Sequence, residues 1–324
     1  MSEISQSVDV TIIVVSFNTC DLTYQCLKSI YLQARAVTFE VIVVDNASTD
    51  RSAQIVAEHF PQVKLIANTE NRGFAAANNQ AFAIARGRHV LLLNSDTIVL
   101  DSAIDKCVEY ADEHPDIGAL GPKVLWPAGD HQSSAFRFPS LLVLLFQSIG
   151  LPDHSWLNYD RYGARNWDKT HDVDVIAGCF LMVRSEIIQT VGMLDEDFFL
   201  YGEEAEWCYR IKKANWHIVY WPGAQIIHIK GGSSGKDTDP RAILVKRAMG
   251  LVLLEKIRGT AVTWVGNLIM TFALLPRIPV WSIRSFRAQR DGRSAEMLKG
   301  HIRIIAFHLK CLVIPAWRRG TFWA

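Results

Sequence analysis

The chain has 324 residues, enough for one large domain or two ordinary ones, and a formal net charge of only +1. The charge is unevenly spread, because 15 of the 34 Lys and Arg residues lie after residue 240, where only three acidic residues occur. The acidic body argues against a nucleic-acid partner, since nucleic-acid-binding proteins normally present a basic face. The basic, apolar tail suits an anionic membrane surface instead.

The cysteines and the N-terminus indicate the compartment. The six cysteines are scattered and include no Cys-x-x-Cys pair, which predicts reduced core residues of a cytosolic protein. No basic region followed by an apolar one opens the sequence, so we expect no cleaved secretion signal. Together with the basic tail, these features predict a cytoplasmic protein that is peripheral or monotopic on the inner face of the cell membrane.

From Val10 to about Gly121, short β-branched runs alternate with segments of helical period. This alternation is typical of βαβ units and predicts an α/β fold with a mainly parallel, Rossmann-like sheet flanked by helices. Ligands of such sheets bind at the carboxyl ends of the strands. Each strand is followed by polar residues, so we expect a binding crevice there. The predicted strands are Val10–Ser16, Phe39–Val44, Val63–Ala67 and His89–Leu93.

The middle of the chain, from Pro122 to Asp172, has no clear period and carries an apolar patch from Leu141 to Leu151. We expect a mobile acceptor-side region there. Beyond it, the pattern predicts a helix over about residues 202–214 and a flexible loop from Gly231 to Gly235. Four further strands are predicted at residues 173–177, 180–183, 217–221 and 225–229.

The tail after residue 240 reads as amphipathic helix. The 18 uncharged residues between Arg258 and Arg277 reach the threshold for a membrane-spanning helix, although Gly266 and Pro276 weaken it. Flanking tryptophans favour a membrane interface. We therefore expect an interfacial or re-entrant helix, with a buried core helix as the alternative. The predicted organisation is an α/β body at 1–240 and a basic, membrane-associating helical extension at 241–324.

Asp96 and His228 are candidate metal ligands. Asp96 follows the apolar run of the fourth strand, where a divalent cation and a diphosphate could meet. Read alone, such an Asp is more often a turn or capping residue, and His228 is more often a satisfied core histidine. Together they would form a mixed oxygen and nitrogen shell, completed by water and phosphate oxygens, that suits Mn²⁺ or Mg²⁺.

Glu203, Glu204 and Glu206 open the predicted helix at 202–214. Acidic residues favour a helix N-terminus through the dipole, which is the simpler interpretation. Glu206 can pair with Arg210 one turn later, which leaves Glu203 or Glu204 to act as a base. A carboxylate that accepts the proton of an attacking hydroxyl contributes about 10²–10⁴ in rate.

Asp45 ends the second strand, as an acid also does in dinucleotide-binding dehydrogenases. Those enzymes need a Gly-x-Gly-x-x-Gly turn after strand one, whereas this chain has Ser-Phe-Asn-Thr-Cys-Asp from Ser16, which argues against hydride transfer. Asp45 fits a hydrogen bond from the imide N–H of a pyrimidine, with Asn18 lining the same pocket. Arg72 and Asn78 are candidates to reach the nucleotide, although a plain surface or turn role fits each of these residues equally well when it is read alone.

Four motifs in order give the chain a family resemblance: Val-Val-Ser-Phe-Asn ending at Asn18, Val-Val-Asp-Asn-Ala-Ser-Thr-Asp ending at Asp50, Asn-Arg-Gly-Phe-Ala-Ala-Ala-Asn ending at Asn78, and Leu-Asn-Ser-Asp ending at Asp96. The series resembles glycosyltransferase family 2, of the GT-A fold, and its rhamnosyltransferase-like branch in bacterial cell-surface polysaccharide synthesis. The resemblance covers about residues 9–236, so it implies a catalytic domain at 1–240.

The resemblance also implies roles for individual residues. Asn94-Ser95-Asp96 matches the metal and diphosphate motif, with Asn in place of its first Asp, and His228 matches the downstream metal ligand. Glu204 falls where the family's base is usually Asp, and Glu203 remains a competitor. The remaining expectations are nucleotide-sugar binding by Ser16, Asn18, Asp45, Arg72, Asn78, Asn94 and Ser95, and an acceptor side at Gly178 and Trp207.

The resulting expectation is an inverting, metal-dependent glycosyltransferase. It would move a hexose or rhamnose from a UDP- or dTDP-sugar to a polyprenyl-diphosphate-linked saccharide in cell-wall, O-antigen or exopolysaccharide synthesis. A nucleotidyltransferase is disfavoured, because it needs a Gly-rich, basic phosphate loop after strand one, and none is present. A non-catalytic assembly or carbohydrate-binding protein with the same fold is the alternative.

Overall fold

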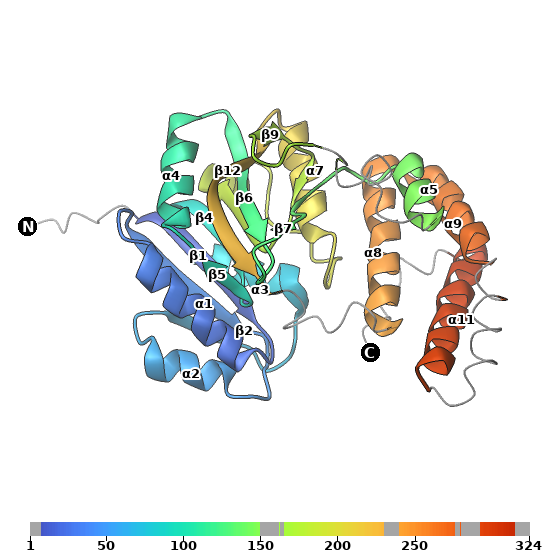
Figure 1. Ribbon diagram of the computed structural model, residues 1–324, viewed down its shortest axis with the longest axis horizontal. Helices are drawn as coiled ribbons and strands as arrows, with labels where there is room; N and C mark the ends of the chain where they lie inside the picture. Colours follow the sequence, from blue (N-terminus) through green and yellow to red (C-terminus); the bar gives the residue numbers. More distant parts are fainter. Residues whose placement is uncertain are drawn as a thin grey trace, which may run out of the picture. The chain divides into compact units, whose positions relative to one another are not determined.

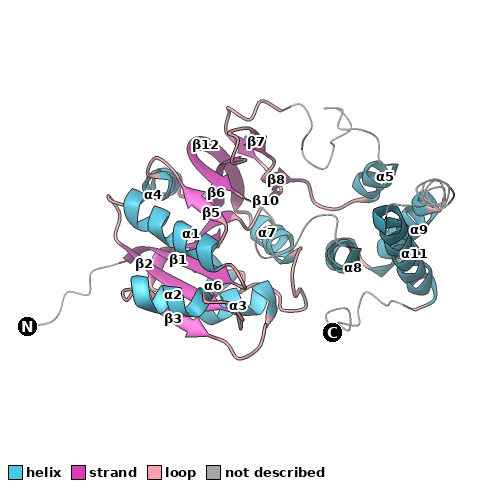
Figure 2. Ribbon diagram, turned by 60° about the horizontal axis from the view of Figure 1, so that its bottom comes forward, coloured by secondary structure: helices cyan, strands magenta, loops and turns pink. Residues whose placement is uncertain are grey.

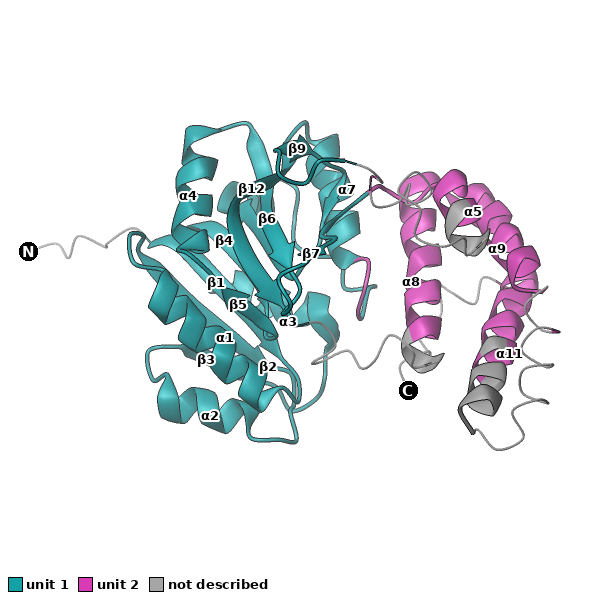
Figure 3. Ribbon diagram, in the orientation of Figure 1, with its two compact units in different colours: residues 1–136, 165–199, 203–234 teal, residues 137–164, 200–202, 235–324 magenta. Residues whose placement is uncertain are grey.

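The computed structural model describes residues 8–149, 162, 165–229, 240–275, 279 and 292–314. The chain divides into two compact units (Figure 3). Unit 1 comprises residues 1–136, 165–199 and 203–234, and unit 2 comprises residues 137–164, 200–202 and 235–324. Whether the boundary expected at residues 240–241 separates two domains that fold independently stays a prediction.

Unit 1 is an α/β layer structure around one large sheet (Figures 1 and 2). The strand order is β3-β2-β1-β4-β11-β6-β12-β5, and the first four of these are parallel. β11 runs antiparallel to both of its neighbours, which makes the sheet mixed. The principal strands are β1 (Val8–Ser16), β2 (Phe39–Asp45), β3 (Lys64–Ala67), β4 (Gly87–Asn94), β5 (Thr97–Val99), β6 (Ile117–Leu125), β11 (Phe180–Arg184) and β12 (His217–His228).

The parallel strands are nearly continuous apolar runs because helices cover both faces of the sheet (Figure 2). On one face, Val10, Ile12 and Val14 of β1 join a single buried cluster with Cys26 and Leu27 of α1. The expected fold class is confirmed. The helices of unit 1 are α1 (Cys20–Gln33), α2 (Ser52–His59), α3 (Gly73–Phe82), α4 (Ala103–Glu113), α6 (Ser185–Thr190) and α7 (Glu203–Lys213).

Two strands expected at residues 217–221 and 225–229 form one strand, β12, whose pairing with β6 shifts register between Trp221 and Gln225. Pro222 lies in that gap and has no N–H to donate, which explains why the ladder is interrupted without the strand ending. Short strands complete the unit: β7 (His131–Gln132), β8 (Ala135–Phe136), β9 (His171–Asp172) and β10 (Val175–Ile176).

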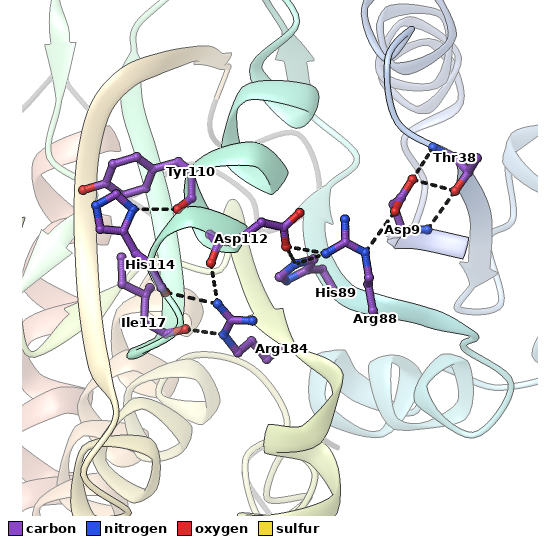
Figure 4. A network of polar contacts seen from close by, with 10 residues as sticks. Asp9, Thr38, Arg88, His89, Tyr110, Asp112, His114, Ile117 and Arg184 are labelled. Atoms are coloured by element: carbon purple, nitrogen blue, oxygen red, sulfur yellow. Dashed lines mark hydrogen bonds and ion pairs between the residues drawn. The ribbon is translucent and has the colours of Figure 1, made fainter. Parts of the chain in front are cut away.

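A polar network ties the amino ends of β1 and β4 to α4 (Figure 4). Arg88 donates to Asp9 and pairs with Asp112, and the ring Nε2 of the buried His89 lies 2.9 Å from the same Asp112 carboxylate. Burial lowers the pKa of His89. The network lies at the opposite ends of these strands from the predicted crevice, so we assign it a structural role.

Unit 2 is helical and contains α5 (Leu141–Ile149), α8 (Pro240–Arg258), α9 (Thr260–Leu274) and α11 (Gly292–Val313). Gly266 lets α9 approach its neighbours, because a Cβ atom there would come within 2.8 Å of both Leu144 of α5 and Leu254 of α8. The apolar patch of the expected mobile region is therefore largely a packed helix, and residues 150–161 lie outside the described residues.

The helix expected at the membrane interface is α9, which has two contrasting faces. Asn267 is fully buried and bonds to His308 of α11 through two hydrogen bonds, with Nδ2 to the backbone oxygen at 3.0 Å and Oδ1 to the ring Nδ1 at 2.7 Å. Phe272 on the other face is 66% exposed. Within the part of the chain that the structure describes, no helix is long and apolar enough to cross a membrane.

Candidate functional site

The strands β1, β2 and β4, whose carboxyl ends are predicted to line a crevice, end side by side. These strands are in register, with Ser16 beside Asp45 across one pair and Val15 beside Asn94 across the other. The loops that follow all leave from the same edge of the sheet. The structure thereby brings the polar residues of four distant sequence motifs to one place.

Asp96 and His228 meet across the β5–β12 pair. Residue 228 lies opposite Thr97 in that antiparallel ladder, and the Ile229 N–H donates to the backbone oxygen of Asp96 at 3.0 Å. The ring Nε2 of His228 lies 3.2 Å from Oδ1 of Asp96, and both side chains are almost entirely buried. Asn94 places its Nδ2 3.4 Å from the same ring nitrogen.

This group of side chains fits a divalent cation. Within the described ranges, no cluster of three or more His, Cys, Asp or Glu side chains could hold a metal by itself. Asp96 and His228 supply one oxygen and one nitrogen donor, and Mg²⁺ and Mn²⁺ commonly complete such incomplete shells with water and substrate phosphate oxygens. These two protein donors would leave the other coordination positions to water and phosphate oxygens.

Ser16 and Ser95 are present at the site, but their hydroxyls point into a buried cluster. The Thr19 hydroxyl lies 3.1 Å from the hydroxyls of both serines, and Thr23 lies 2.9 Å from Ser16. All four residues are at most 4% exposed. These side chains fasten the loop after β1 to the loop after β4. Any contact that these residues make with a nucleotide sugar would therefore come from their backbone atoms.

Asp45 has an acceptor to offer. Its Oδ2 accepts a hydrogen bond from the Ser48 N–H at 3.0 Å. Its Oδ1 is buried and finds no hydrogen-bond partner among the described residues. Because a buried carboxylate oxygen without a partner is costly, this atom is suited to receive an N–H from a ligand.

Asn18 follows β1 in a left-handed backbone conformation, with φ of 53°. Its side-chain oxygen accepts from the Thr49 N–H at 2.7 Å, and its own N–H donates to the Ser48 hydroxyl at 2.9 Å. The side chain of Asn18 thus ties the loop after β1 to the loop after β2.

Asn46 organises the next loop and is absent from the residues selected from the sequence. Its Nδ2 donates to Asn71 Oδ1 at 2.8 Å and to the Gly73 carbonyl at 3.1 Å, while its Oδ1 accepts from Asn68 and from the Arg72 N–H. Nearly all of its hydrogen-bonding capacity is used inside a site that is only 2% exposed. Its place directly after Asp45 was the available signal.

Arg72 directly precedes α3, and Asn78 lies within it. Arg72 is exposed, so its guanidinium is placed to meet a ligand in solution. Asn78 is 1% exposed and donates to the Phe74 carbonyl at 2.8 Å, while its Oδ1 has no partner among the described residues. Gly73 begins α3 with φ of +80°, and a Cβ there would lie 2.5 Å from the Phe199 carbonyl oxygen, so only glycine fits.

The acidic cluster opens α7 as expected. Glu206 receives the Arg210 guanidinium at 2.8 and 2.9 Å, which confirms the predicted pair. Glu203 is 3% exposed, and burial together with the neighbouring Glu204 carboxylate raises its pKa well above the usual range. Glu204 is half-buried. The structure therefore gives the two adjacent carboxyl groups different environments.

Gly178 and Cys179 lie between Glu204 of the acidic cluster and the group formed by Asn94, Asp96 and His228. Burial raises the pKa of the Cys179 thiol to about 12, with further contributions from the Asp96 and Glu204 carboxylates. The backbone oxygen of Cys179 accepts from the Asn94 N–H at 3.2 Å. The segment of Gly178 and Cys179 thus lies beside both the candidate base and the candidate metal ligands.

Trp207, which was expected on the acceptor side, is an internal residue of unit 1. Its side chain is fully buried, packs against Phe82 with ring centroids 5.5 Å apart, and donates to the Gly192 carbonyl at 2.8 Å. Trp207 lies on the buried face of α7 with Glu203 and Glu206, whereas Glu204 lies on the half-exposed face. The indole therefore anchors α7, and the acceptor-side role of Gly178 stays a prediction.

Comparison with known families gives one match over more than half of the chain. The model of "Glycosyl transferase family 2" matches residues 11–192. This range contains the loops after β1, β2, β3 and β4, with Asp45, Asn78 and Asp96. The motifs that built the crevice are therefore the ones that the family match covers.

Among curated proteins, the chain is similar to the N-acetylglucosaminyl-diphospho-decaprenol L-rhamnosyltransferase of Mycobacterium tuberculosis. The two are 30% identical over 211 residues, covering 61% of this chain and 68% of the mycobacterial protein. This chain is also 28% identical over 242 residues to the O-antigen biosynthesis protein RfbC of Myxococcus xanthus, and the match covers 72% of this chain and 18% of RfbC.

A solved structure shares the fold over most of the chain. The mannosyltransferase PcManGT from Pyrobaculum calidifontis, in complex with GDP-Man and Mn²⁺, aligns with a TM-score of 0.55 and 17% identity. The alignment covers 96% of this chain and 88% of the archaeal one. At this identity the likeness supports the fold alone.

Proposed function

Since this chain belongs to glycosyl transferase family 2 and is a glycosyltransferase, we propose that it catalyses an inverting, metal-dependent transfer of a hexose or rhamnose. The donor is a UDP- or dTDP-sugar, and the acceptor is a polyprenyl-diphosphate-linked saccharide of cell-surface polysaccharide synthesis. The observation that carries the proposal is the approach of Asp96 and His228 to 3.2 Å at the carboxyl ends of the strands. The similarity to a decaprenol-linked rhamnosyltransferase supports the acceptor class.

Each residue has one task in this reaction. Asp45 accepts the imide N–H of the pyrimidine base through its unpartnered Oδ1, and Arg72 meets the diphosphate from the exposed start of α3. Asp96 and His228 hold Mn²⁺ or Mg²⁺. When bound, the cation neutralises negative charge that gathers on the departing nucleoside diphosphate.

Glu204 is the proposed base. It removes the proton from an acceptor hydroxyl, the freed oxygen forms a bond to the anomeric carbon, and the bond from that carbon to the diphosphate oxygen breaks. A single displacement assisted by one base inverts the anomeric configuration. Burial and a raised pKa make Glu203 better suited to remain a neutral acid, which favours Glu204 for the role.

The test is a donor screen with the full chain. We expect Mn²⁺- or Mg²⁺-dependent hydrolysis or transfer with one member of a panel of UDP-, dTDP- and GDP-sugars. EDTA removes this activity, added Mn²⁺ restores it, and Asp96→Ala is not restored. The product anomer, assigned by NMR, reports inversion. A folded chain that binds and turns over no donor, with or without lipid-linked acceptor, would favour the non-catalytic alternative.

We further propose that unit 2 binds the lipid surface that carries the acceptor, which would place the protein on the cytoplasmic face of the membrane. The exposed apolar residues of α9 recur at spacings of four and three, as do those of α11, so each helix presents one apolar stripe. Arg303 and Lys310 are exposed beside the second stripe, which suits anionic headgroups. The stripes are Ala261, Val265, Leu268, Phe272 and Leu275, and Ile302, Ala306, Leu309 and Val313.

Vesicle flotation tests this surface. We expect the protein to float with vesicles that contain phosphatidylglycerol and to be released in part by high salt. Phe272→Glu weakens flotation, whereas the same change at Leu32, an exposed apolar residue of α1 in unit 1, leaves it unaltered. Equal flotation of the two variants would refute a lipid-binding role for the α9 stripe.

A further inference from the structure

Gln132 forms two hydrogen bonds with His228. Its side-chain Oε1 lies 2.6 Å from the ring Nδ1 of His228, and its Nε2 donates to the backbone oxygen of the same residue at 3.1 Å. Gln132 is 6% exposed, so water does not replace either bond at low cost. Both ends of one glutamine amide are therefore spent on one histidine.

The fold places this glutamine through a short hairpin. Gln132 lies in β7 opposite Val124 of β6, and β6 continues alongside β12, where Leu125 lies beside Ile227. The next residue of β12 is His228. The hairpin thus places the Gln132 amide against the end of β12, next to the His228 ring that faces Asp96.

The orientation of the amide follows from the backbone contact. A carbonyl oxygen can only accept, so the amide atom that faces the His228 carbonyl must be the NH₂ group. The atom that faces Nδ1 is then Oε1, which can also only accept. Nδ1 must therefore carry a hydrogen, so that of the two neutral tautomers the contacts select the one with its lone pair on Nε2.

That lone pair is directed into the group that we assign to the metal. Nε2 is the ring atom 3.2 Å from Asp96 Oδ1 and 3.4 Å from Asn94 Nδ2. In the Nδ1–H tautomer, Nε2 and the carboxylate are two electron-pair donors facing each other, an arrangement that a shared cation stabilises. A histidine ligand whose second nitrogen donates to a fixed acceptor is also held in one ring orientation.

We propose that Gln132 is a positioning residue, which holds His228 in the Nδ1–H tautomer and aims its Nε2 at the Asp96 side of the site. The use of this tautomer for metal binding rests on the proposed function. The tautomer itself is a property of the metal-free protein and can be tested without that function. Gln132 acts through His228 and touches no reacting atom. No other side chain in the described residues is shown bonding to the His228 Nδ1.

The direct test is the tautomer of His228 in the metal-free protein. Long-range ¹H–¹⁵N spectra of the ¹⁵N-histidine-labelled chain distinguish the two neutral tautomers, and His228→Ala assigns the signal among the ten histidines. We expect the Nδ1–H form in the wild type and a mixture in Gln132→Leu. A wild-type ring with its hydrogen on Nε2 would overturn the proposal, whether or not the leucine variant folds.

The second readout is Mn²⁺ affinity, measured by EPR titration in the presence of UDP and, separately, of dTDP. Loss of a partner of this kind typically weakens metal binding by about 10–100-fold. We expect a loss in this range for Gln132→Leu, with smaller losses for Gln132→Glu, which keeps an acceptor for Nδ1. Gln54→Leu, a change on the exposed face of α2, serves as the matched control and should bind as the wild type does.

The outcomes separate the two proposals. A folded Gln132→Leu with wild-type Mn²⁺ affinity overturns the positioning role. If the wild-type protein binds no Mn²⁺ with either nucleotide, and Asp96→Ala gives the same titration, the metal-dependent function is overturned instead. The tautomer of His228 then still decides whether Gln132 fixes the ring.

Discussion

Gly178 lies directly against Glu204: a Cβ atom added to Gly178 would be 3.9 Å from the Glu204 Cβ and 3.6 Å from the Phe74 ring. The segment that we expect on the acceptor side therefore runs beside the carboxylate that we propose as the base. Glu203, one residue earlier on α7, turns into the protein and is 3% exposed. Two adjacent carboxyl groups thus differ in their exposure to solvent.

Exchanging each glutamate for glutamine should separate their roles. Glu204→Gln removes the base and should lower kcat by about 10²–10⁴. Glu203→Gln is close in shape and charge to the neutral acid that burial favours, so it should lower kcat by at most about tenfold. Steady-state kinetics of sugar transfer measure both. A larger loss from Glu203→Gln than from Glu204→Gln would reverse the assignment.

Asp45→Asn should weaken donor binding while the chain stays folded. The asparagine keeps an oxygen for the Ser48 N–H, 3.0 Å away in the native pair, but replaces the charged acceptor at the unpartnered Oδ1. A hydrogen bond to a charged group contributes about 1.5–3 kcal/mol, which corresponds to roughly 10–100-fold in Kd. Calorimetric titration with UDP and dTDP measures this loss. Unchanged affinity for both nucleotides would exclude Asp45 from base recognition.

Asn46→Ala should loosen the crevice and destabilise the fold. It removes donors to Asn71 and Gly73 and an acceptor for Asn68, all within a buried site, so we expect a loss of about 2–4 kcal/mol. Urea unfolding measures the stability. Gln54→Ala on the exposed face of α2 is the control and should change stability by less than about 0.5 kcal/mol. Equal effects would show that the Asn46 network contributes little.

The sequence predicted the parts of the site that depend on local pattern. Apolar runs located the parallel strands, and the rule that ligands bind at their carboxyl ends selected Asp45 and Asp96. The pairing of Glu206 with Arg210 followed from helical spacing. These features depend on residues close together in one helix or strand, or on a general rule for parallel sheets. The sequence pattern alone was therefore enough to predict them.

Other features depend on contacts that no local pattern encodes. Gln132 belongs to a two-residue strand, and its partner His228 is far along the chain. Ser16 was assigned to the ligand, but its place in the β1 ladder turns its hydroxyl toward Thr19 and Thr23. The burial of Trp207 follows from the packing of α7 against Phe82, which the helical period could not identify.

Glu40 should make the fold sensitive to acid. Burial by itself raises the pKa of this carboxyl, but hydrogen bonds from Lys64 at 2.7 Å, from the Thr11 hydroxyl at 2.7 Å and from Arg86 outweigh it and lower the pKa from 4.5 to about 2. A group whose folded pKa is depressed stabilises the fold above its unfolded pKa. That stability is lost as the pH falls from about 4.5 toward 2.

Glu40→Gln should therefore cost about 2–3 kcal/mol in the free energy of unfolding at pH 7, and the difference from the wild type should shrink across the window from pH 4.5 to 2. Urea unfolding at several pH values measures both effects. Glu58→Gln is the matched control, because its pairing with Arg51 spans 3.4 Å between exposed side chains and should contribute at most about 1 kcal/mol. A Glu40→Gln deficit that stays constant from pH 7 to pH 3 would show that the glutamine is poorly packed and that the carboxylate charge contributes nothing. A deficit that closes on acidification would assign this part of the acid sensitivity to the ion pairs at the amino end of the sheet.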